Sequence, residues 1–208
     1  MKKPLSVLAI GNVRLGARRA RAARWPAPLS VSELRCLLGR ARRQAAIGPL
    51  SPDGARGIAL AFVGGHHGHA QWAGPLVEAL GLCAHFFVPL ESIGLPGRMT
   101  LFQLEELGRC RGAKIELDLS LTRPRTTRSL ATQIRQRAAT LRSRTGHRPR
   151  YAWVRGEEWD GRLSLLLQQH RFQGAVSADI ARHEVAERTP LLAARYPSWR
   201  HRWGWGRF

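Results

Sequence analysis

The chain has 208 residues, 44% of them hydrophobic, and its 34 lysine and arginine residues outnumber its 14 acidic residues to give a formal net charge of +20. This length and apolar content predict one domain with a sizeable core and exclude a disordered tail. The three cysteines exclude a fully paired disulfide framework, and their spacing excludes a CxxC zinc motif.

The amino terminus reads MKKPLSVLAIGNV, in which two lysines precede a short apolar patch. The patch is too short for a transmembrane helix, is soon interrupted by Gly11, Asn12 and Arg14, and lacks the small-residue cleavage pattern of a signal peptide. It is better interpreted as a first strand near Val7. The sequence thus predicts a soluble protein, with a cytoplasmic location favoured over a role at a bacterial cell envelope.

An arginine-rich loop is predicted over residues 18–28, before a helix that is capped by Ser30 or Ser32 and reaches about Arg43. Residues 48–54, GPLSPDG, are rich in glycine and proline, which break regular secondary structure. This break separates the helix from the apolar runs that follow.

Two short apolar runs enclose a segment of helical periodicity. Residues 58–62, IALAF, are continuously apolar and lie between glycines, which is typical of a parallel strand buried on both faces. Residues 84–89, AHFFVP, form the second run, in which we interpret His85 as a core histidine. Because apolar residues between the two runs recur at helical spacing, the pattern predicts a strand, helix, strand crossover unit.

The same alternation continues along the chain and predicts an α/β fold. Helices are expected near Leu37, Leu76, Leu104, Ile134 and Leu166. Strands are expected near Val7, Leu60, Phe87, Ile115, Ala152 and Ala175, with a seventh near Leu192.

Basic residues gather in two stretches of the chain. Residues 1–50 hold eleven lysines and arginines against Glu33 alone, and the interval between Asp118 and Glu157 holds ten arginines and no acid. A field of one sign attracts polyanions such as nucleic acid, acidic polysaccharide or anionic lipid. The alternative is that the second group forms the solvated face of an amphipathic helix around Ile134.

Residues 1–197 are predicted to form a single domain, and residues 198–208, SWRHRWGWGRF, a basic tail. Alternating tryptophan and arginine can stack on bases or sugars while pairing with anions. Arg200, Trp203 and Trp205 are therefore the candidate polyanion contacts. Interfacial membrane anchoring and packing of the tryptophans on the domain are the alternatives.

The segments IALAFVGG, GLCAHFFVP, PGRMTLFQLEEL and GAKIELDLSLT occur in this order. They resemble the polysaccharide deacetylase family (the NodB-homology domain, carbohydrate esterase family 4), in which the first strand ends in TFDDG, the second reads ATFFV and a later strand carries GHEIGSHTxxH. The resemblance covers roughly Leu5 to Pro197 and is best over residues 57–180. It implies an incomplete (β/α)7-type barrel and a hydrolase that acts on carbon–nitrogen bonds other than peptide bonds.

The resemblance also implies that the family's chemistry is altered here. The family's general base falls on Val63 and a metal-ligating aspartate on Gly64, while its two metal-binding histidines fall on Asp118 and Thr122. Family chemistry uses a divalent metal to polarise an acetamide carbonyl and to activate water, which these residues do not reproduce. The favoured hypothesis is therefore a catalytically impaired homologue, a pseudoenzyme that binds a saccharide or a partner protein and holds no cofactor.

Residues 151–156, YAWVRG, align with the family segment that orients the base, without its prolines. Trp153, Arg155 and Glu157 are the candidate ligand contacts in this part of the cleft. A charged turn before the next helix explains Glu157 equally well.

His66, His67 and His69 follow the altered loop directly. With Asp118 they are candidate ligands of a relocated zinc or other divalent metal, because barrel folds place their sites where strands end. A metal there would give an active deacetylase of N- or O-acetylated carbohydrate, so whether the chain is an enzyme is left open. A solvated polar loop is the alternative, and a polyanion-binding module is the third hypothesis for the whole chain.

Overall fold

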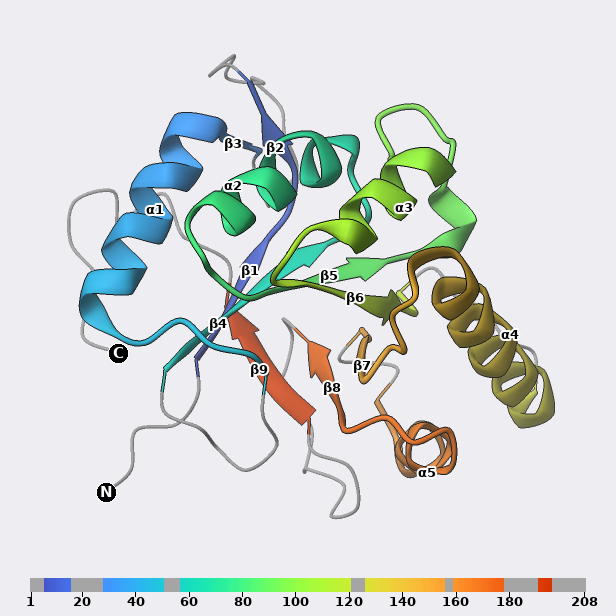
Figure 1. Cartoon of the computed structure of the whole chain (residues 1–208). Coiled ribbons are helices and arrows are strands. Elements are labelled where there is room, and N and C mark those ends of the chain that lie inside the picture. The colour runs from blue at the N-terminus through green and yellow to red at the C-terminus, as the bar shows by residue number, and fades with distance from the viewer. Residues whose placement is uncertain are drawn as a thin grey trace, which may run out of the picture.

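The computed structural model describes residues 6–15, 28–50, 57–120, 126–155, 159–177 and 191–195. Parallel strands close into a barrel in the order β1-β4-β5-β6-β7-β8-β9 (Figure 1). The barrel strands are β1 (Ser6–Ile10), β4 (Ile58–Val63), β5 (Ala84–Val88), β6 (Ala113–Asp118), β7 (Tyr151–Trp153), β8 (Gly174–Ser177) and β9 (Leu191–Arg195). Two short strands, β2 (Val13–Arg14) and β3 (Leu29–Ser30), pair separately.

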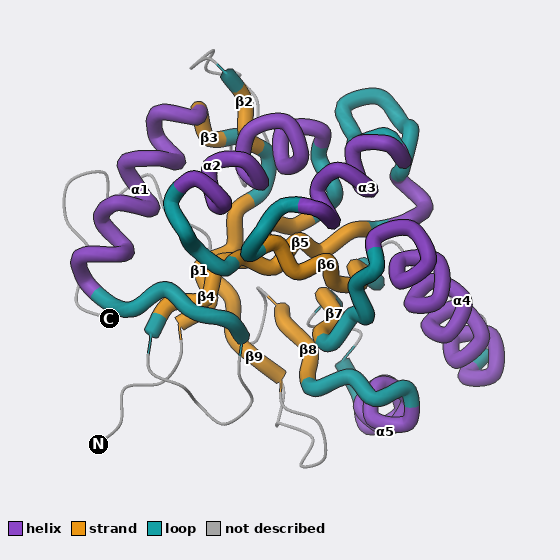
Figure 2. Tube along the Cα trace, in the orientation of Figure 1, coloured by secondary structure: helices purple, strands orange, loops and turns teal. Residues whose placement is uncertain are grey.

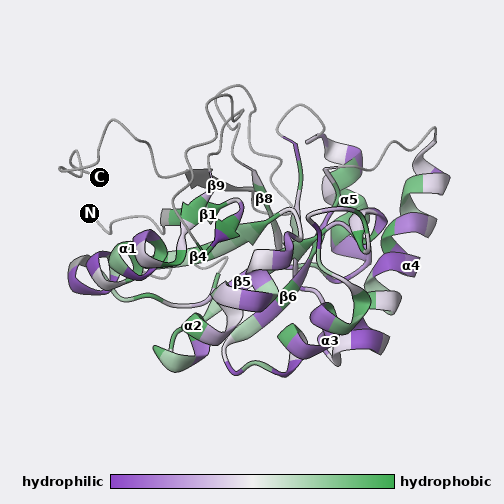
Figure 3. Cartoon of the chain, turned by 90° about the horizontal axis from the view of Figure 1, so that it is seen from above, coloured by the Kyte–Doolittle hydropathy of each residue, from purple (hydrophilic) through white to green (hydrophobic). Residues whose placement is uncertain are grey.

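Helices connect the strands and cover the outside of the barrel (Figure 2). They are α1 (Val31–Gln44), α2 (Gly74–Ala79), α3 (Leu101–Arg109), α4 (Thr127–Thr145) and α5 (Gly161–Gln169), with the short helical turns η1 (His69–Ala73) and η2 (Leu90–Ser92). Viewed from above, hydrophobic colour dominates the central strands, and hydrophilic colour gathers on the helices (Figure 3). The amphipathic helices thus pack their apolar faces on the strands.

The strand β4 shows how one sequence run supplies two cores. Every residue of β4 is buried. Ala59, Ala61 and Val63 belong to one apolar cluster, whereas Leu60 and Phe62 belong to a second cluster that includes helix residues. Because successive strand side chains point to opposite faces, the first set lines the barrel interior and the second faces the helices. Small side chains on the inner set suit a narrow barrel.

Local capping signals fix the ends of the helices. Ser30, rather than Ser32, caps α1: its Oγ accepts a hydrogen bond from the Glu33 amide at 3.2 Å, and Glu33 Oε2 accepts one from the Ser30 amide at 2.9 Å. This reciprocal pair is a capping box. Helix α4 ends at Gly146, whose φ of 73° is the left-handed conformation that glycine adopts most easily.

The predicted fold class is confirmed. Each expected strand and helix is present near the predicted residue, and the seventh strand, at Leu192, is β9. Register pairs Val7 with Ala194 and Leu8 with Arg195 join β9 to β1 and close the ring. The barrel is incomplete in the sense that it has one strand fewer than the common eight-stranded form. Within the described ranges, no helix is both long and apolar enough to cross a membrane.

Candidate functional site at the carboxyl end of the barrel

A buried polar network fills the part of the barrel interior nearest the amino ends of the strands. The Leu50 amide donates to His85 Nε2 at 3.0 Å, so the proton of this imidazole is on Nδ1, which donates to Glu116 Oε1 at 2.9 Å. Glu116 Oε2 accepts from the Arg150 and Tyr151 amides at 2.6 and 2.9 Å. The Tyr151 hydroxyl donates to the Leu50 carbonyl at 3.0 Å. His85 is therefore a satisfied core histidine, as predicted, and a ligand site is expected at the opposite, carboxyl end.

The chain turns sharply where β4 ends, at two glycines with left-handed backbone. Gly64 has a φ of 94° and Gly65 a φ of 59°, and both values disfavour residues with a side chain. A Cβ placed on Gly64 would lie 3.0 Å from Arg98 Nη1 and 3.2 Å from His66 Nε2. The position that the family resemblance assigns to a metal-ligating aspartate therefore has a backbone that disfavours one and is crowded by the ends of the Arg98 and His66 side chains, and the preceding Val63 is a buried apolar residue.

Arg98 lies beside Gly64 because the loop that follows β4 is hydrogen-bonded, backbone to backbone, to the segment that carries Arg98. The His67 amide donates to the Gly97 carbonyl at 3.3 Å, and the Met99 amide donates to the Gly65 carbonyl at 3.0 Å. Met99 is fully buried, which fixes the segment further. Sequence reasoning missed Arg98, whose only signal is its place inside the segment PGRMT.

The guanidinium of Arg98 is itself held in place. Its Nη1 donates to the Gly64 carbonyl and lies 3.2 Å from His66 Nε2. Burial, followed by the charge of Arg98, lowers the pKa of His66 to about 4. His66 is therefore neutral at pH 7, and its Nε2 accepts from Arg98.

Asp118 ends β6 and is 1% exposed. Its Oδ1 accepts from the Ser120 amide at 2.9 Å and from the Ser120 hydroxyl at 2.6 Å, whereas its Oδ2 has no hydrogen-bond partner. Burial raises the pKa of Asp118 to about 6; the hydrogen bonds from Ser120 and the charge of Arg98 act in the opposite direction, and Glu91 raises it further. The site thus contains a carboxyl group that gains or loses its proton near neutral pH.

His69 lies in the barrel wall rather than at its mouth. It is fully buried, its Nε2 donates to the Gly11 carbonyl, and its ring packs edge-on against Phe62 at a centroid distance of 5.5 Å. Burial lowers the pKa of His69 to about 3, so the imidazole is neutral. The His66 and His69 rings are neighbours, with centroids 5.4 Å apart.

The histidines and Asp118 do not form the relocated metal centre that we considered from the sequence. Among the described residues, no three histidine, cysteine, aspartate or glutamate side chains are grouped so that they could hold a metal ion. His69 directs Nε2 to a backbone carbonyl and leaves its buried Nδ1 without a hydrogen-bond partner, and His66 Nε2 accepts from a guanidinium. Within the described ranges, these side chains therefore do not fit a divalent cation.

The structure describes two of the three predicted ligand contacts, Trp153 and Arg155. Trp153 on β7 lies beside Asp118 on β6, as its partner in the strand register. It is 5% exposed and packs on Phe87 at a centroid distance of 5.7 Å. Arg155 is half-buried just after β7. The following predicted site residues lie outside the described part of the chain: Thr122, Glu157, Arg200, Trp203 and Trp205.

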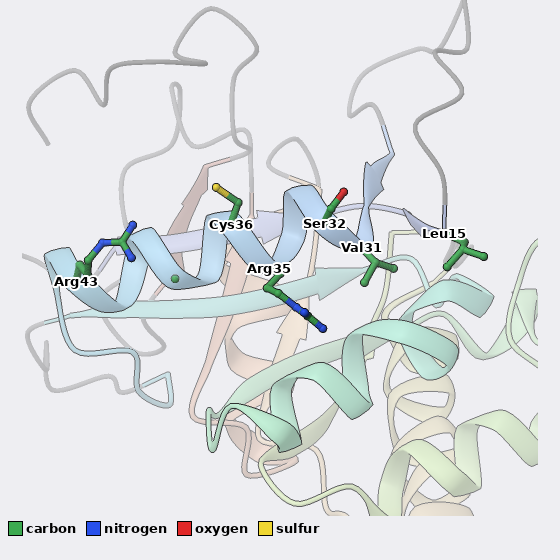
Figure 4. Close-up of a pocket in the computed structure, with 7 residues that line it drawn as sticks. Leu15, Val31, Ser32, Arg35, Cys36 and Arg43 are labelled. Atoms are coloured by element: carbon green, nitrogen blue, oxygen red, sulfur yellow. The ribbon is translucent and has the colours of Figure 1, made fainter.

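A separate groove of about 590 Å³ runs along α1 (Figure 4). Arg35 and Val31 project toward one side of the helix, and Cys36 and Ser32 toward another. None of the site residues predicted from the sequence lines this groove. Its lining residues are Leu15, Val31, Ser32, Arg35, Cys36, Gly39 and Arg43.

Comparison with known proteins identifies the fold. No protein-family model and no curated protein matches the sequence. Among solved structures, IcaB from Ammonifex degensii superposes with a TM-score of 0.71 at 16% identity, over 95% of this chain and 93% of the other. This chain has the fold of polysaccharide deacetylases. The Streptococcus pyogenes deacetylase PplD gives a TM-score of 0.71 at 11% identity over 94% and 93%, and a polysaccharide deacetylase from Bacillus cereus gives 0.66 at 10% over 93% and 65%.

The resemblance read from the strand segments is thus confirmed at the level of fold. The deacetylase-like barrel places the ends of β4, β6 and β7 together at one rim, since all the strands are parallel. At that rim lie a fixed arginine, a neutral imidazole and a carboxyl group that is half protonated near pH 6. Such a set can bind a polar ligand through directed hydrogen bonds.

Proposed function

We propose that this protein binds a saccharide at the carboxyl end of its barrel and does not carry out metal-dependent deacetylation there. The proposal is supported by the likeness to deacetylases of polysaccharide and by the residues at the rim. The observation that carries it is the contact between Arg98 and Gly64, where a cation stands in place of a metal-ligating carboxylate.

The electrostatics of the rim argue against a divalent cation. A guanidinium is charged at every physiological pH, so a metal ion beside it would meet repulsion in a partly buried environment. Asp118 supplies a single carboxyl group, and one of its oxygens is already occupied by Ser120. Fixed hydrogen-bond donors, by contrast, are groups that hold a polar ligand such as a sugar.

The test combines metal content, turnover and binding on the purified full-length chain. We expect less than stoichiometric zinc or cobalt, no acetate released from an acetylated chito-oligomer above the background of heat-denatured protein, and measurable saccharide binding by calorimetry. Stoichiometric metal that is lost in His66→Ala, together with acetate release, would overturn the proposal. Absence of saccharide binding would favour a protein partner.

A second candidate function is polyanion binding, because of the arrangement of arginines on α4. Arg128, Arg135 and Arg142 recur every seven residues, so they share one face of the helix at intervals of about 10 Å. All three are exposed and form no ion pair within the described residues, whereas Arg137 pairs with Glu91 at 2.5 Å.

Retention on heparin and on DNA at increasing salt tests this candidate. Replacing Arg128, Arg135 and Arg142 by glutamine should lower the eluting salt concentration and the salt dependence of binding. A matched control replaces Arg35, Arg42 and Arg43 of α1, which removes the same charge elsewhere. Equal effects of the two triple variants would show that net charge alone is responsible.

A further inference from the structure

We propose that Arg98 anchors the carboxylate of an acidic saccharide at the carboxyl end of the barrel. This inference rests on the proposed saccharide binding and narrows it to sugars that carry a carboxylate, such as uronic acids.

Among the described residues, the contacts of the Arg98 guanidinium involve a single nitrogen. Nη1 contacts the Gly64 carbonyl and His66, whereas Nη2 and Nε make no hydrogen bond with the described residues. No acidic side chain in the described ranges forms an ion pair with Arg98. A half-buried cation without a counter-ion is unfavourable, so the site favours an anionic ligand. The Nε and Nη2 donors lie on one edge and match the two oxygens of a carboxylate.

The neighbours of Arg98 do not neutralise it. His66 is uncharged at pH 7 because its pKa is lowered to about 4. Glu91, which acts on the same site electrostatically, is engaged by Arg137. Asp118 lies within electrostatic range of Arg98 but beyond ion-pair distance, and its Oδ2 is left without a partner.

Arg98 is also preorganised for binding. Its segment is tied to the β4 loop by the hydrogen bonds of Gly97 and Met99, and Nη1 is held by Gly64. Binding therefore costs little additional side-chain ordering. One fixed guanidinium fits one carboxylate on a sugar ring, whereas a nucleic acid would need a row of cations along its phosphates.

The test compares an acidic and a neutral oligosaccharide by calorimetry at about 0.15 M ionic strength. The probes are a hyaluronan tetrasaccharide, which alternates glucuronate with N-acetylglucosamine, and N-acetylated chitotetraose, which has no carboxylate. We expect the acidic probe to bind about tenfold more tightly or better, the effect of one charge-assisted hydrogen bond. Arg98→Gln should abolish this preference by weakening the binding of the acidic probe more than that of chitotetraose, and Arg98→Lys should retain part of the preference. Arg42→Gln, an exposed charge change on α1, should have no effect.

The outcomes separate this inference from the proposed function. Equal affinity of the two probes would overturn the acidic-saccharide inference and leave saccharide binding intact. Binding of neither probe would overturn both. Competition by inorganic phosphate or acetate with the same affinity as the tetrasaccharide would show a simple anion site and would also overturn the inference. Circular dichroism of each variant checks folding; if Arg98→Gln is unfolded, the comparison of wild type with Arg98→Lys decides.

Discussion

Arg98 Nη1 donates to the carbonyl oxygen of Gly64, and the same atom lies 3.0 Å from where a side chain on that glycine would begin. The two residues are 34 positions apart in the chain. The left-handed φ of Gly64 favours a glycine at this position, and its contact with Arg98 places a cation at the rim of the barrel. The predictions below test this contact, the buried polar groups and the role of the histidines.

Substitution of Gly64 should destabilise the fold more than substitution of a glycine with similar backbone and open surroundings. Gly64→Ala is expected to cost about 2–3 kcal/mol, because φ strain adds to the contact with Arg98. Gly81→Ala is the control, since Gly81 has a φ of 61° but nothing within 4 Å of an added Cβ. Urea unfolding measures both. Equal costs would show that crowding by Arg98 does not contribute.

Glu116 should be essential to the buried network inside the barrel. Glu116→Ala leaves the His85 Nδ1 donor and the Arg150 and Tyr151 amides without their acceptor, and we expect a loss of about 3 kcal/mol or more in the free energy of unfolding. The control is Glu106→Ala, which removes an exposed carboxylate paired with Arg109 and should cost less than about 1 kcal/mol. Similar losses in both variants would contradict the network's role.

The stability difference between wild type and Asp118→Asn should depend on pH. Burial raises the pKa of Asp118 from 3.8 to about 6, so the folded state binds this proton more tightly than the unfolded chain. The buried charge therefore destabilises wild type at pH above about 6, and the penalty fades as the pH falls to about 4. The free energy of unfolding of Asp118→Asn minus that of wild type should therefore be larger at pH 8 than at pH 4, by about 2–3 kcal/mol. A difference that does not vary with pH would contradict the raised pKa.

His69 should contribute to stability, and metal should not. His69→Ala removes a fully buried ring and leaves the Gly11 carbonyl without its donor, so a loss of about 2–4 kcal/mol is expected. His67→Ala, at a half-exposed position, should cost less than about 1 kcal/mol. Thermal melting with and without EDTA is the second measurement. A melting temperature that EDTA lowers in wild type but not in His69→Ala would show that this histidine binds metal.

The sequence by itself determined the order of the elements. Continuous apolar runs such as residues 58–62 identify buried parallel strands, and the serines at 30 and 32 indicate where a helix begins. His85 could be interpreted as a core residue because its neighbours in the run are apolar. These signals are local, since periodicity and capping depend on residues within a turn or two. The order of the motifs then indicated the deacetylase-like barrel.

Only the tertiary structure decided what the rim contains. Closure of the barrel brings Arg98 onto Gly64, turns His69 into the wall toward Gly11, and buries Asp118 with one oxygen unpartnered. The three histidines looked like metal ligands because their spacing is close, yet spacing does not tell which way each ring points once the loop is anchored. Such contacts join segments 34 and 58 residues apart, and no local pattern in the sequence encodes them.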